Sequence, residues 1–199
     1  MARSVSSKLH FELNTDIRAE VVYDPIAQAV HWLVAALAVG VVLLGWTIGG
    51  VPRNTPQRWI VILLHESVGL TILAAMVFRA WWRRRHPPPP LVVSRLEAGL
   101  AWLTHMALYV LLIFMPLAGY WSIAAAGDEV SFFGVLRIPP LLPGNNRLSQ
   151  VAIAIHLVGQ YLLYLFIALH VAGAMFHGVV RRDGVIGRMV PLRGRAIGR

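Results

Sequence analysis

The stretch HLVGQYLLYLFIALH, residues 156–170, is an apolar run of helix-forming length with a histidine at each end. Between these histidines it contains no Lys, Arg, Asp or Glu. At 100° and 1.5 Å per residue, the step from His156 to His170 turns an α-helix by close to four whole turns and advances it by about 21 Å. The two imidazoles therefore share one face of the predicted helix and lie near opposite edges of a membrane span.

The composition of the whole chain is that of an integral membrane protein. Of its 199 residues, 57% are hydrophobic and 14% are charged, and its mean hydropathy is +0.65. A hydrocarbon core of about 30 Å is crossed by roughly 20 helical residues. Four segments with almost no charged residue meet this length, at 25–52, 59–78 (which contains Glu66), 98–127 and 148–180. We predict an all-α, four-helix membrane bundle, because backbone in lipid must satisfy its own hydrogen bonds and the segments are too long for barrel strands.

The domain organisation that we predict is a single bundle with short tails. Residues 1–24 form an N-terminal tail, 25–180 the transmembrane domain, and 181–199 a basic C-terminal tail. The tail at 1–24 is polar and does not resemble a cleavable signal peptide, so we expect the first apolar segment to direct insertion. The third connection is the longest and is rich in aromatic residues and proline, and we expect it to fold over the outer end of the bundle.

The net charge of +9 is distributed unevenly along the chain. Of the 18 basic residues, 14 fall in the N-terminal tail, the segment 79–95 and the segment from 181 onward, whereas the other two connections hold only Arg53, Arg58, Arg137 and Arg147. This is the positive-inside pattern, and it predicts a multi-pass protein with both termini in the cytoplasm. The basic residues are explained by topology and by attraction to anionic lipid, so we do not expect nucleic-acid binding.

Four histidines at matching depths indicate a redox cofactor. His31 lies near the cytoplasmic start of the first predicted helix, and His65 lies near the outer start of the second. We therefore pair His31 with His170 in an inner layer and His65 with His156 in an outer layer. Facing imidazoles are the two axial ligands that a haem b requires, whereas each histidine alone is also compatible with an interhelical hydrogen bond.

Other metal centres fit the sequence less well. The chain has no cysteine, which excludes thiolate sites, iron–sulfur clusters and covalently attached haem c. The histidines do not form the compact cluster that zinc prefers. A methionine in an apolar helix is usually a packing residue, and we interpret Met76, Met106, Met115 and Met175 in that way.

Three further residues have both a cofactor interpretation and a structural one. Gly69, one turn after His65, leaves room for a macrocycle or serves ordinary helix packing. Arg79 shares a face with His65 at the inner edge, where it binds a haem propionate or extends toward the membrane surface. His105 is a hydrogen-bond donor to a propionate or to backbone, or a packing residue.

Several motifs together resemble the bacterial cytochrome b561 family, whose members are four-helix di-haem relatives of hydrogenase cytochrome b subunits. They are YDPIAQAVHW (23–32), LHESVGLTIL (64–73) followed by Arg79, THMALYVLLIFMPLAG (104–119) and LHVAGAMFHGVVRRDGVIGRMVP (169–191). The resemblance covers residues 22–191 and implies two non-covalent haems b, each with two histidine ligands, at His31, His65, His156 and His170. It also implies a bacterial inner-membrane location and quinone-linked electron transfer, and in some members oxidation of superoxide with ubiquinone as acceptor.

The chain departs from the family pattern at two places. Relatives often have a basic residue where this chain has Gln28, and a Lys-His-His sequence where it has Phe-His-Gly at 176–178. The remaining His177 lies seven residues after His170, about 10 Å further along the same helix face. We interpret His177 as a donor of a hydrogen bond and a proton to quinone, with a plain interfacial residue beside Arg181 and Arg182 as the alternative.

The sequence thus predicts a di-haem membrane cytochrome b that transfers electrons between a small reductant, such as superoxide, and quinone. As an enzyme it would be a quinone-linked oxidoreductase of the superoxide:ubiquinone type. The alternative is an anchor and electron-relay subunit for a partner dehydrogenase or hydrogenase, and a third possibility is a haem-free assembly protein. Beyond these candidates, the partners that we expect are the lipid bilayer and quinone.

Overall fold

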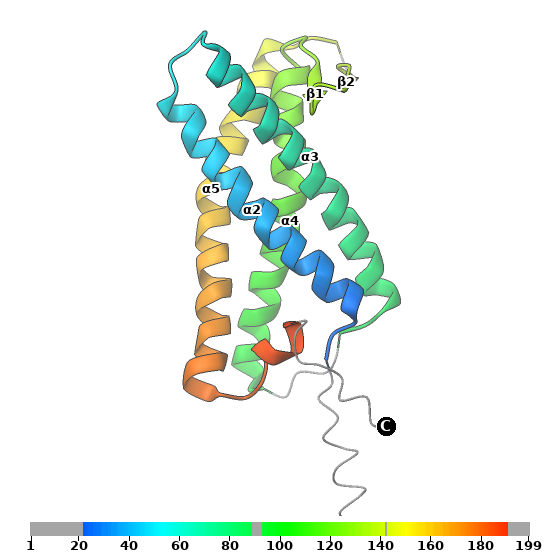
Figure 1. Cartoon of the computed structure of the whole chain (residues 1–199), viewed down its shortest axis with the longest axis vertical. Helices are drawn as coiled ribbons and strands as arrows, with labels where there is room; N and C mark the ends of the chain where they lie inside the picture. The colour runs from blue at the N-terminus through cyan, green and yellow to red at the C-terminus, as the bar shows by residue number, and fades with distance from the viewer. Residues whose placement is uncertain (1–21, 89–92, 142, 191–199) are drawn as a thin grey trace, which may run out of the picture.

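A computed structural model describes residues 22–88, 93–141 and 143–190. Four helices, all long and apolar enough to cross a membrane, make up most of these residues: α2 (Pro25–Gly50), α3 (Pro56–Arg85), α4 (Arg95–Ala124) and α5 (Asn146–Met175). The chain continues from α5 into a π-helical turn, η1 (Phe176–Arg181), and a short 3₁₀ helix, η2 (Ile186–Met189). The predicted all-α membrane bundle is confirmed (Figure 1).

Each long helix begins at a polar capping residue that precedes its apolar run. Asp24, Thr55, Ser94 and Asn145 each accept hydrogen bonds from backbone N–H groups of the first turn. Because these caps lie upstream of the apolar residues, α3, α4 and α5 begin two or three residues earlier than the hydropathy pattern predicts. The helix α3 also extends seven residues beyond the predicted position 78, since arginines are favourable in the last turn of a helix, and Arg79 therefore lies inside it.

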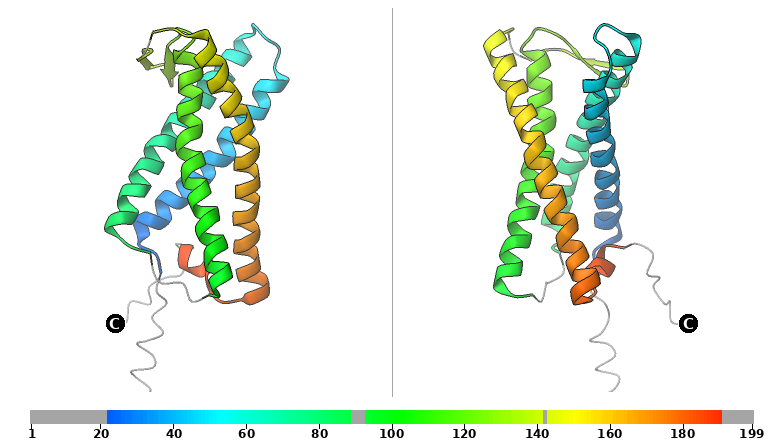
Figure 2. Two further views of the ribbon diagram at one scale, coloured as in Figure 1. Left: turned by 180° about the vertical axis from the view of Figure 1, so that it is seen from behind. Right: turned by 90° about the vertical axis from the view of Figure 1, so that its left-hand side faces the viewer.

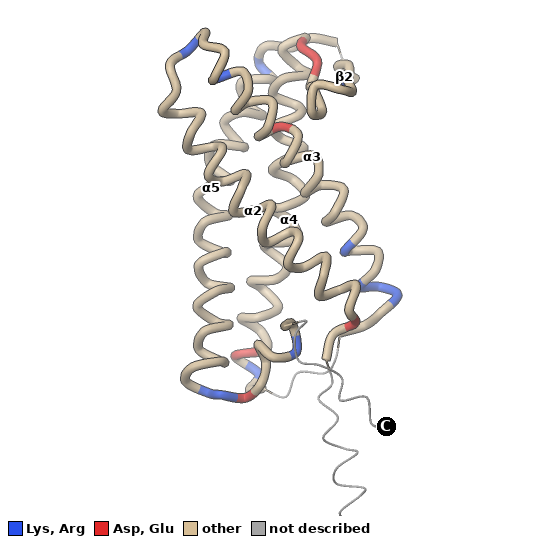
Figure 3. Tube along the Cα trace, in the orientation of Figure 1, with Lys and Arg blue, Asp and Glu red and all other residues tan. Residues whose placement is uncertain are grey.

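The bundle has two distinct ends. At the tail end α2 and α4 begin and α3 and α5 finish, and at the hairpin end strands β1 (Val130–Phe132) and β2 (Leu136–Ile138) form an antiparallel pair. Charged residues gather mainly toward these ends (Figure 3). The third connection lies over the hairpin end as expected: Ser67 of α3 is fully buried, and its Oγ accepts a hydrogen bond of 2.8 Å from the Phe133 amide.

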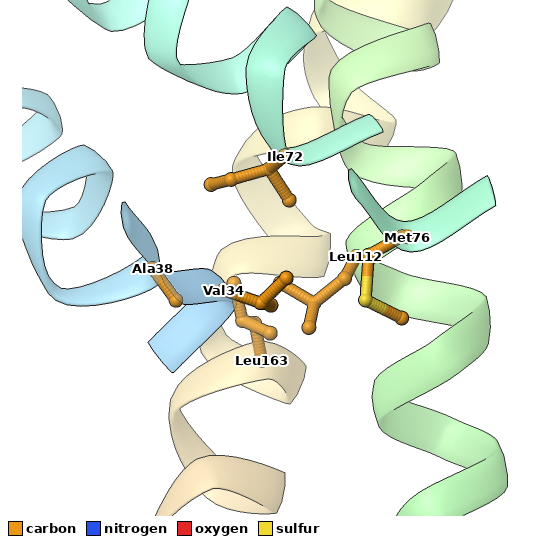
Figure 4. Packing of buried hydrophobic residues seen from close by; sticks show 6 residues of the cluster. All are labelled: Val34, Ala38, Ile72, Met76, Leu112 and Leu163. Atoms are coloured by element: carbon orange, nitrogen blue, oxygen red, sulfur yellow. The ribbon is translucent and has the colours of Figure 1, made fainter. Parts of the chain in front are cut away.

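Consecutive helices pack against each other, α2 on α3, α3 on α4 and α4 on α5 (Figure 2). An apolar cluster with members from all four helices lies in the middle of the bundle, formed by Val34, Ala38, Ile72, Met76, Leu112 and Leu163 (Figure 4). Leu163 is seven residues from both His156 and His170. The cluster therefore separates the two levels at which the histidines lie.

The C-terminal segment folds back onto the start of α2. The backbone carbonyl of Arg188 accepts hydrogen bonds from the Gln28 side chain (2.9 Å) and from the Tyr23 amide (3.1 Å), and the Met189 carbonyl accepts one from the Trp32 indole (2.7 Å). These bonds fix residues 186–189 across the tail end. Most of the predicted N-terminal tail and the last nine residues of the C-terminal tail, 191–199, lie outside the described residues.

Candidate functional site

The structure brings the four histidines of the membrane spans together as two facing pairs. In the tail-end pair, His31 of α2 and His170 of α5 have ring centroids 6.0 Å apart and ring planes at 83°. In the hairpin-end pair, His65 of α3 and His156 of α5 have ring centroids 6.0 Å apart and ring planes at 71°. The helix rise between His156 and His170 places the two pairs about 21 Å apart along α5.

The separation within each pair fits two imidazoles on opposite sides of one iron. Two metal–nitrogen bonds of about 2 Å, with each ring centroid about 1.2 Å behind its ligating nitrogen, separate the centroids by about 6 Å. Both pairs have this spacing. Among the described residues, no group of three or more His, Cys, Asp or Glu side chains could hold a metal ion. Two opposed imidazoles with nothing else to complete a tetrahedral site suit a planar porphyrin better than zinc.

Hydrogen bonds define the ring orientation in the hairpin-end pair. His65 Nδ1 lies 3.1 Å from the Val41 carbonyl oxygen of α2, and His156 Nδ1 lies 2.9 Å from the Met115 carbonyl oxygen of α4. A carbonyl oxygen only accepts, so Nδ1 carries the hydrogen in both rings and Nε2 keeps its lone pair. This is the arrangement in which a backbone carbonyl orients a metal-ligating histidine.

Glycines on the neighbouring helices make room for these two rings. A Cβ at Gly45 would lie 3.4 Å from the ring of His65, and a Cβ at Gly119 would lie 3.3 Å from the ring of His156. Each glycine is four residues after the residue whose carbonyl holds the ring, Val41 for the first and Met115 for the second. The two histidines therefore rest on the same kind of backbone feature on two different helices, α2 for His65 and α4 for His156. In each case one helical turn offers a carbonyl oxygen and a glycine without a side chain.

The hairpin-end pair faces a cavity of about 310 Å³. Cofactor and ligand sites commonly occupy about 300–1,000 Å³, so this volume suits a large apolar group. Gly69 lines the cavity, and a Cβ there would meet no atom within 4 Å. The lining is mostly apolar, and its polar members include Glu66, Gln160 and Tyr164.

At the tail-end pair, polar atoms lack partners within the protein. The ring of His105 lies 5.2 Å from that of His170, and the guanidinium of Arg79 lies 5.5 Å from the ring centroid of Tyr109. His31 Nδ1 and the Tyr109 hydroxyl are buried and have no hydrogen-bond partner among the described residues. A buried polar atom without a partner is costly, so the Tyr109 hydroxyl is suited to a group that the protein itself does not supply.

A small pocket adjoins Tyr109 on the arginine side. It has a volume of about 30 Å³, and its lining includes Tyr23, Arg79, Arg83 and Tyr109. A water-sized group needs about 10–15 Å³ on this measure, so the pocket admits a carboxylate oxygen. Two guanidinium groups and a phenol are the donors that an anion prefers. A haem whose iron lay between His31 and His170 would find donors for its propionates here.

The residues at the end of α5 are arranged around His177. His177 Nδ1 lies 2.6 Å from Asp183 Oδ2, and 15% of the His177 side chain is exposed. Arg181, one of the two arginines beside His177 in the sequence, forms an ion pair with Glu97 at the start of α4. Gln28 is buried, and its side chain donates a hydrogen bond to the Arg188 carbonyl and so holds the C-terminal segment.

Together, four membrane-spanning helices and two facing histidine pairs define a multi-pass membrane protein of the cytochrome b class. The family model described as prokaryotic cytochrome b561 matches residues 22–192. The chain belongs to this family, and its role is therefore that of a membrane cytochrome b in electron transfer.

Curated relatives agree with the family match. The chain is 30% identical over 174 residues to the "Probable superoxide oxidase CybB" of Yersinia pestis, which covers 85% of this chain and 96% of the relative. It is 30% identical over 179 residues to "Cytochrome b561 homolog 2" of Escherichia coli (strain K12), covering 84% and 90%. It is 26% identical over 169 residues to "Cytochrome b561 homolog 1" of the same strain, covering 82% and 93%.

Two residues that matter in the structure, Gly45 and Asp183, were not singled out by the sequence. Gly45 lies in an apolar run where nothing distinguishes it from a packing glycine, and Asp183 reads as part of an Asp-Gly turn. Tyr109 is recognisable only as a neighbour of His105 at one helical turn. The side chains next to Gly45 and Tyr109 come from another helix, whereas Asp183 reaches His177, six residues earlier, through a turn that has no periodic signal.

Proposed function

We propose that this protein is a di-haem membrane cytochrome b that oxidises superoxide at the hairpin end and reduces quinone at the tail end. Its two histidine pairs, each with the spacing of axial ligands, are the observation that carries the proposal. The similarity to the Yersinia pestis relative, a probable superoxide oxidase, supports superoxide as the reductant. Two superoxide anions would each lose one electron to give two molecules of oxygen, and quinone would take up two electrons and two protons.

The residues that would hold the cofactors follow from the contacts described above. His65 and His156 would bind one haem b through Nε2, and His31 and His170 would bind the other. Arg79 and Tyr109 would bind propionate of the second haem, and His105 would support the ring of His170. When bound, the haems supply one-electron redox chemistry, and an iron with two histidine ligands leaves no open position for oxygen.

The hairpin end would receive the reductant. Of its four arginines, Arg53, Arg137 and Arg147 are exposed, whereas Arg58 donates a hydrogen bond of 2.8 Å to the Val51 carbonyl at the end of α2. Arg137 lies 3.7 Å from Glu129 and is partly neutralised by it. The attraction of an anion would therefore depend mainly on Arg53 and Arg147. We place this end in the periplasm and the tail end, with both termini, in the cytoplasm.

Quinone would be reduced beside His177, because this residue lies in η1, seven residues after His170 of the tail-end pair. An imidazole there can donate a hydrogen bond to a quinone oxygen and supply a proton. Arg181, bound to Glu97, anchors the end of α5 and does not compete for the Asp183 carboxylate that contacts His177.

The test is a two-step electron transfer with the purified protein alone. Superoxide should reduce haems in the purified protein, and a short-chain ubiquinone analogue should reoxidise them. In His177→Ala the haems should still assemble and become reduced, but reoxidation by quinone should slow. Reduction only in the presence of a co-purified dehydrogenase would favour the anchor and relay subunit, and a colourless protein would exclude both functions.

A further inference from the structure

Asp183 is placed to do more than terminate a helix. After η1, Arg182 adopts a left-handed conformation with φ of 51°, and the chain turns so that the Asp183 amide donates to the His177 carbonyl at 3.3 Å. The same turn brings Asp183 Oδ2 to 2.6 Å from His177 Nδ1, and Asp183 Oδ1 accepts from the Val185 amide at 3.2 Å. Both carboxylate oxygens are thus fixed, one on the imidazole and one on the backbone.

The local helix geometry is unusual at this point. The residues that carry His177 form a π turn, a feature that is rare and recurs at functional sites. A Cβ at Gly178 would lie 2.3 Å from Ile186 Cδ1, so the glycine lets η2 pack against η1. This packing closes the loop that contains Asp183.

We propose that Asp183 and His177 form a proton-delivery dyad for quinone reduction, with Asp183 as the positioning residue. The inference rests on the proposed quinone reductase function and adds a residue and a proton route to it. A carboxylate that accepts from Nδ1–H leaves Nε2 as the ring atom that exchanges a proton with substrate.

Both side chains of the dyad are accessible to water. The His177 side chain is 15% exposed and the Asp183 side chain 30% exposed, so the carboxylate lies closer to water. Each proton would leave Nε2 of the imidazolium for a quinone oxygen, and the neutral ring would keep its Nδ1–H bond to Asp183. A proton from water then restores the imidazolium, and two such transfers accompany the two electrons that convert quinone to quinol.

The charges around the dyad favour an anionic Asp183. Burial raises the pKa of this carboxyl, but the hydrogen bonds from His177 and the Val185 amide outweigh it, and the net result is a lowered pKa. Arg181 at the end of η1 and Arg182 just after it flank the dyad, Glu97 approaches from α4 in its ion pair with Arg181, and Arg188 lies on η2. Asp183 is the carboxylate that directly contacts the ring of His177.

The decisive experiment measures reoxidation of the pre-reduced, full-length protein by a short-chain ubiquinone analogue as a function of pH. Asp183→Asn should slow reoxidation about ten-fold or more near neutral pH, while haem content and reduction by superoxide stay unchanged. The dependence of the rate on pH should change as well, because an uncharged amide no longer stabilises a positive charge on the imidazole. Asp183→Glu should restore the pH profile, and Asp128→Asn, the same chemical change at the hairpin end, should leave it intact.

A second variant separates the proton role from a structural one. His177→Asn keeps an N–H donor toward Asp183 but lacks a titratable nitrogen that can pass a proton to quinone. Reoxidation of its haems by quinone should therefore be slow at every pH. Combining it with Asp183→Asn should give no further loss, since two residues that act as one unit are not additive. If Asp183→Asn fails to assemble its haems, the pH dependence of reoxidation in His177→Asn decides whether the dyad delivers protons.

The outcomes distinguish this inference from the proposed function. An Asp183→Asn variant with the wild-type rate and pH profile, or with a slower rate at an unchanged profile, would overturn the dyad. A His177→Asn variant that keeps the wild-type pH dependence would do the same. A wild-type protein that quinone does not reoxidise at all would instead remove the quinone reductase function, and the dyad would fail with it.

Discussion

Gly119→Ala should weaken the hairpin-end haem selectively. The added Cβ would lie 3.3 Å from His156 Cε1 and 3.4 Å from Nδ1, so the ring must shift by a few tenths of an ångström. The shift strains the 2.9 Å hydrogen bond to the Met115 carbonyl that orients the ring. Loss of such an orienting contact typically lowers metal affinity about 10–100-fold, and a partial loss should lower haem affinity by about ten-fold.

The rest of the fold should tolerate this change. Replacing a helical glycine by alanine contributes about 0.5–1 kcal/mol through backbone entropy, so the thermal stability of the haem-free protein should be unchanged or slightly raised. Gly45→Ala should act in the same way but more weakly, because its Cβ would lie 3.4 and 3.7 Å from two atoms of the His65 ring. Gly40→Ala is the matched control on α2, where a Cβ would meet nothing within 4 Å.

The assay is the haem-to-protein ratio after detergent extraction, together with the optical spectrum of the reduced protein. Wild type and Gly40→Ala should retain two haems, and Gly119→Ala should lose mainly one spectral component, the one that His156→Ala also removes. Full retention of both haems with unchanged spectra in Gly119→Ala would refute the role of the bare Cα. Selective loss of the other component would refute the assignment of this glycine to the hairpin-end pair.

Four other expectations follow from the same geometry. Replacing either histidine of the tail-end pair by alanine should remove one spectral component of the reduced protein. Replacing either histidine of the hairpin-end pair should remove the other component. If one histidine from each pair removed the same component, the pairing of the ligands would be wrong. Tyr109→Phe should shift the midpoint potential of the tail-end haem in a redox titration, without loss of stability in the haem-free protein, because the hydroxyl has no protein partner among the described residues. The rate of reduction by superoxide should fall as the salt concentration rises, since the Debye length is about 8 Å at physiological ionic strength. The double variant Arg53→Gln with Arg147→Gln should reduce this salt dependence. A rate that changes neither with salt nor in the double variant would leave membrane topology as the role of these arginines. The pKa of Asp183 lies below its ordinary value of 3.8, so its contribution to stability is present above about pH 4 and is lost as pH falls through the lowered pKa. Acid and the Asp183→Asn substitution should therefore cause the same loss of thermal stability. The two losses should not add in a thermal melt of the variant at low pH.

The site differs from the sequence-based prediction mainly in which polar groups contact one another. Arg58 was counted with the arginines of the outer end, yet its side chain binds carbonyls at the end of α2. His105 was expected to donate to a propionate or to backbone, or to be a packing residue; it has a hydrogen bond with the Ala101 backbone, and its ring also lies against that of His170. Spacing along one helix gives the depth and face of a side chain, but the partner of a long or rotatable side chain depends on how the neighbouring helices are rotated.

The sequence by itself determined the membrane bundle and the depth of each histidine. Lipid solvates no backbone polar group, so four long apolar segments could only be helices, and the fixed rise and turn of a helix then placed His31, His65, His156 and His170 at two levels. Only the tertiary structure decided which atoms orient them. The carbonyls of Val41 and Met115, the orphaned hydroxyl of Tyr109 and the carboxylate of Asp183 reach their places through helix rotation and through a turn after α5, and neither leaves a periodic signal in the sequence.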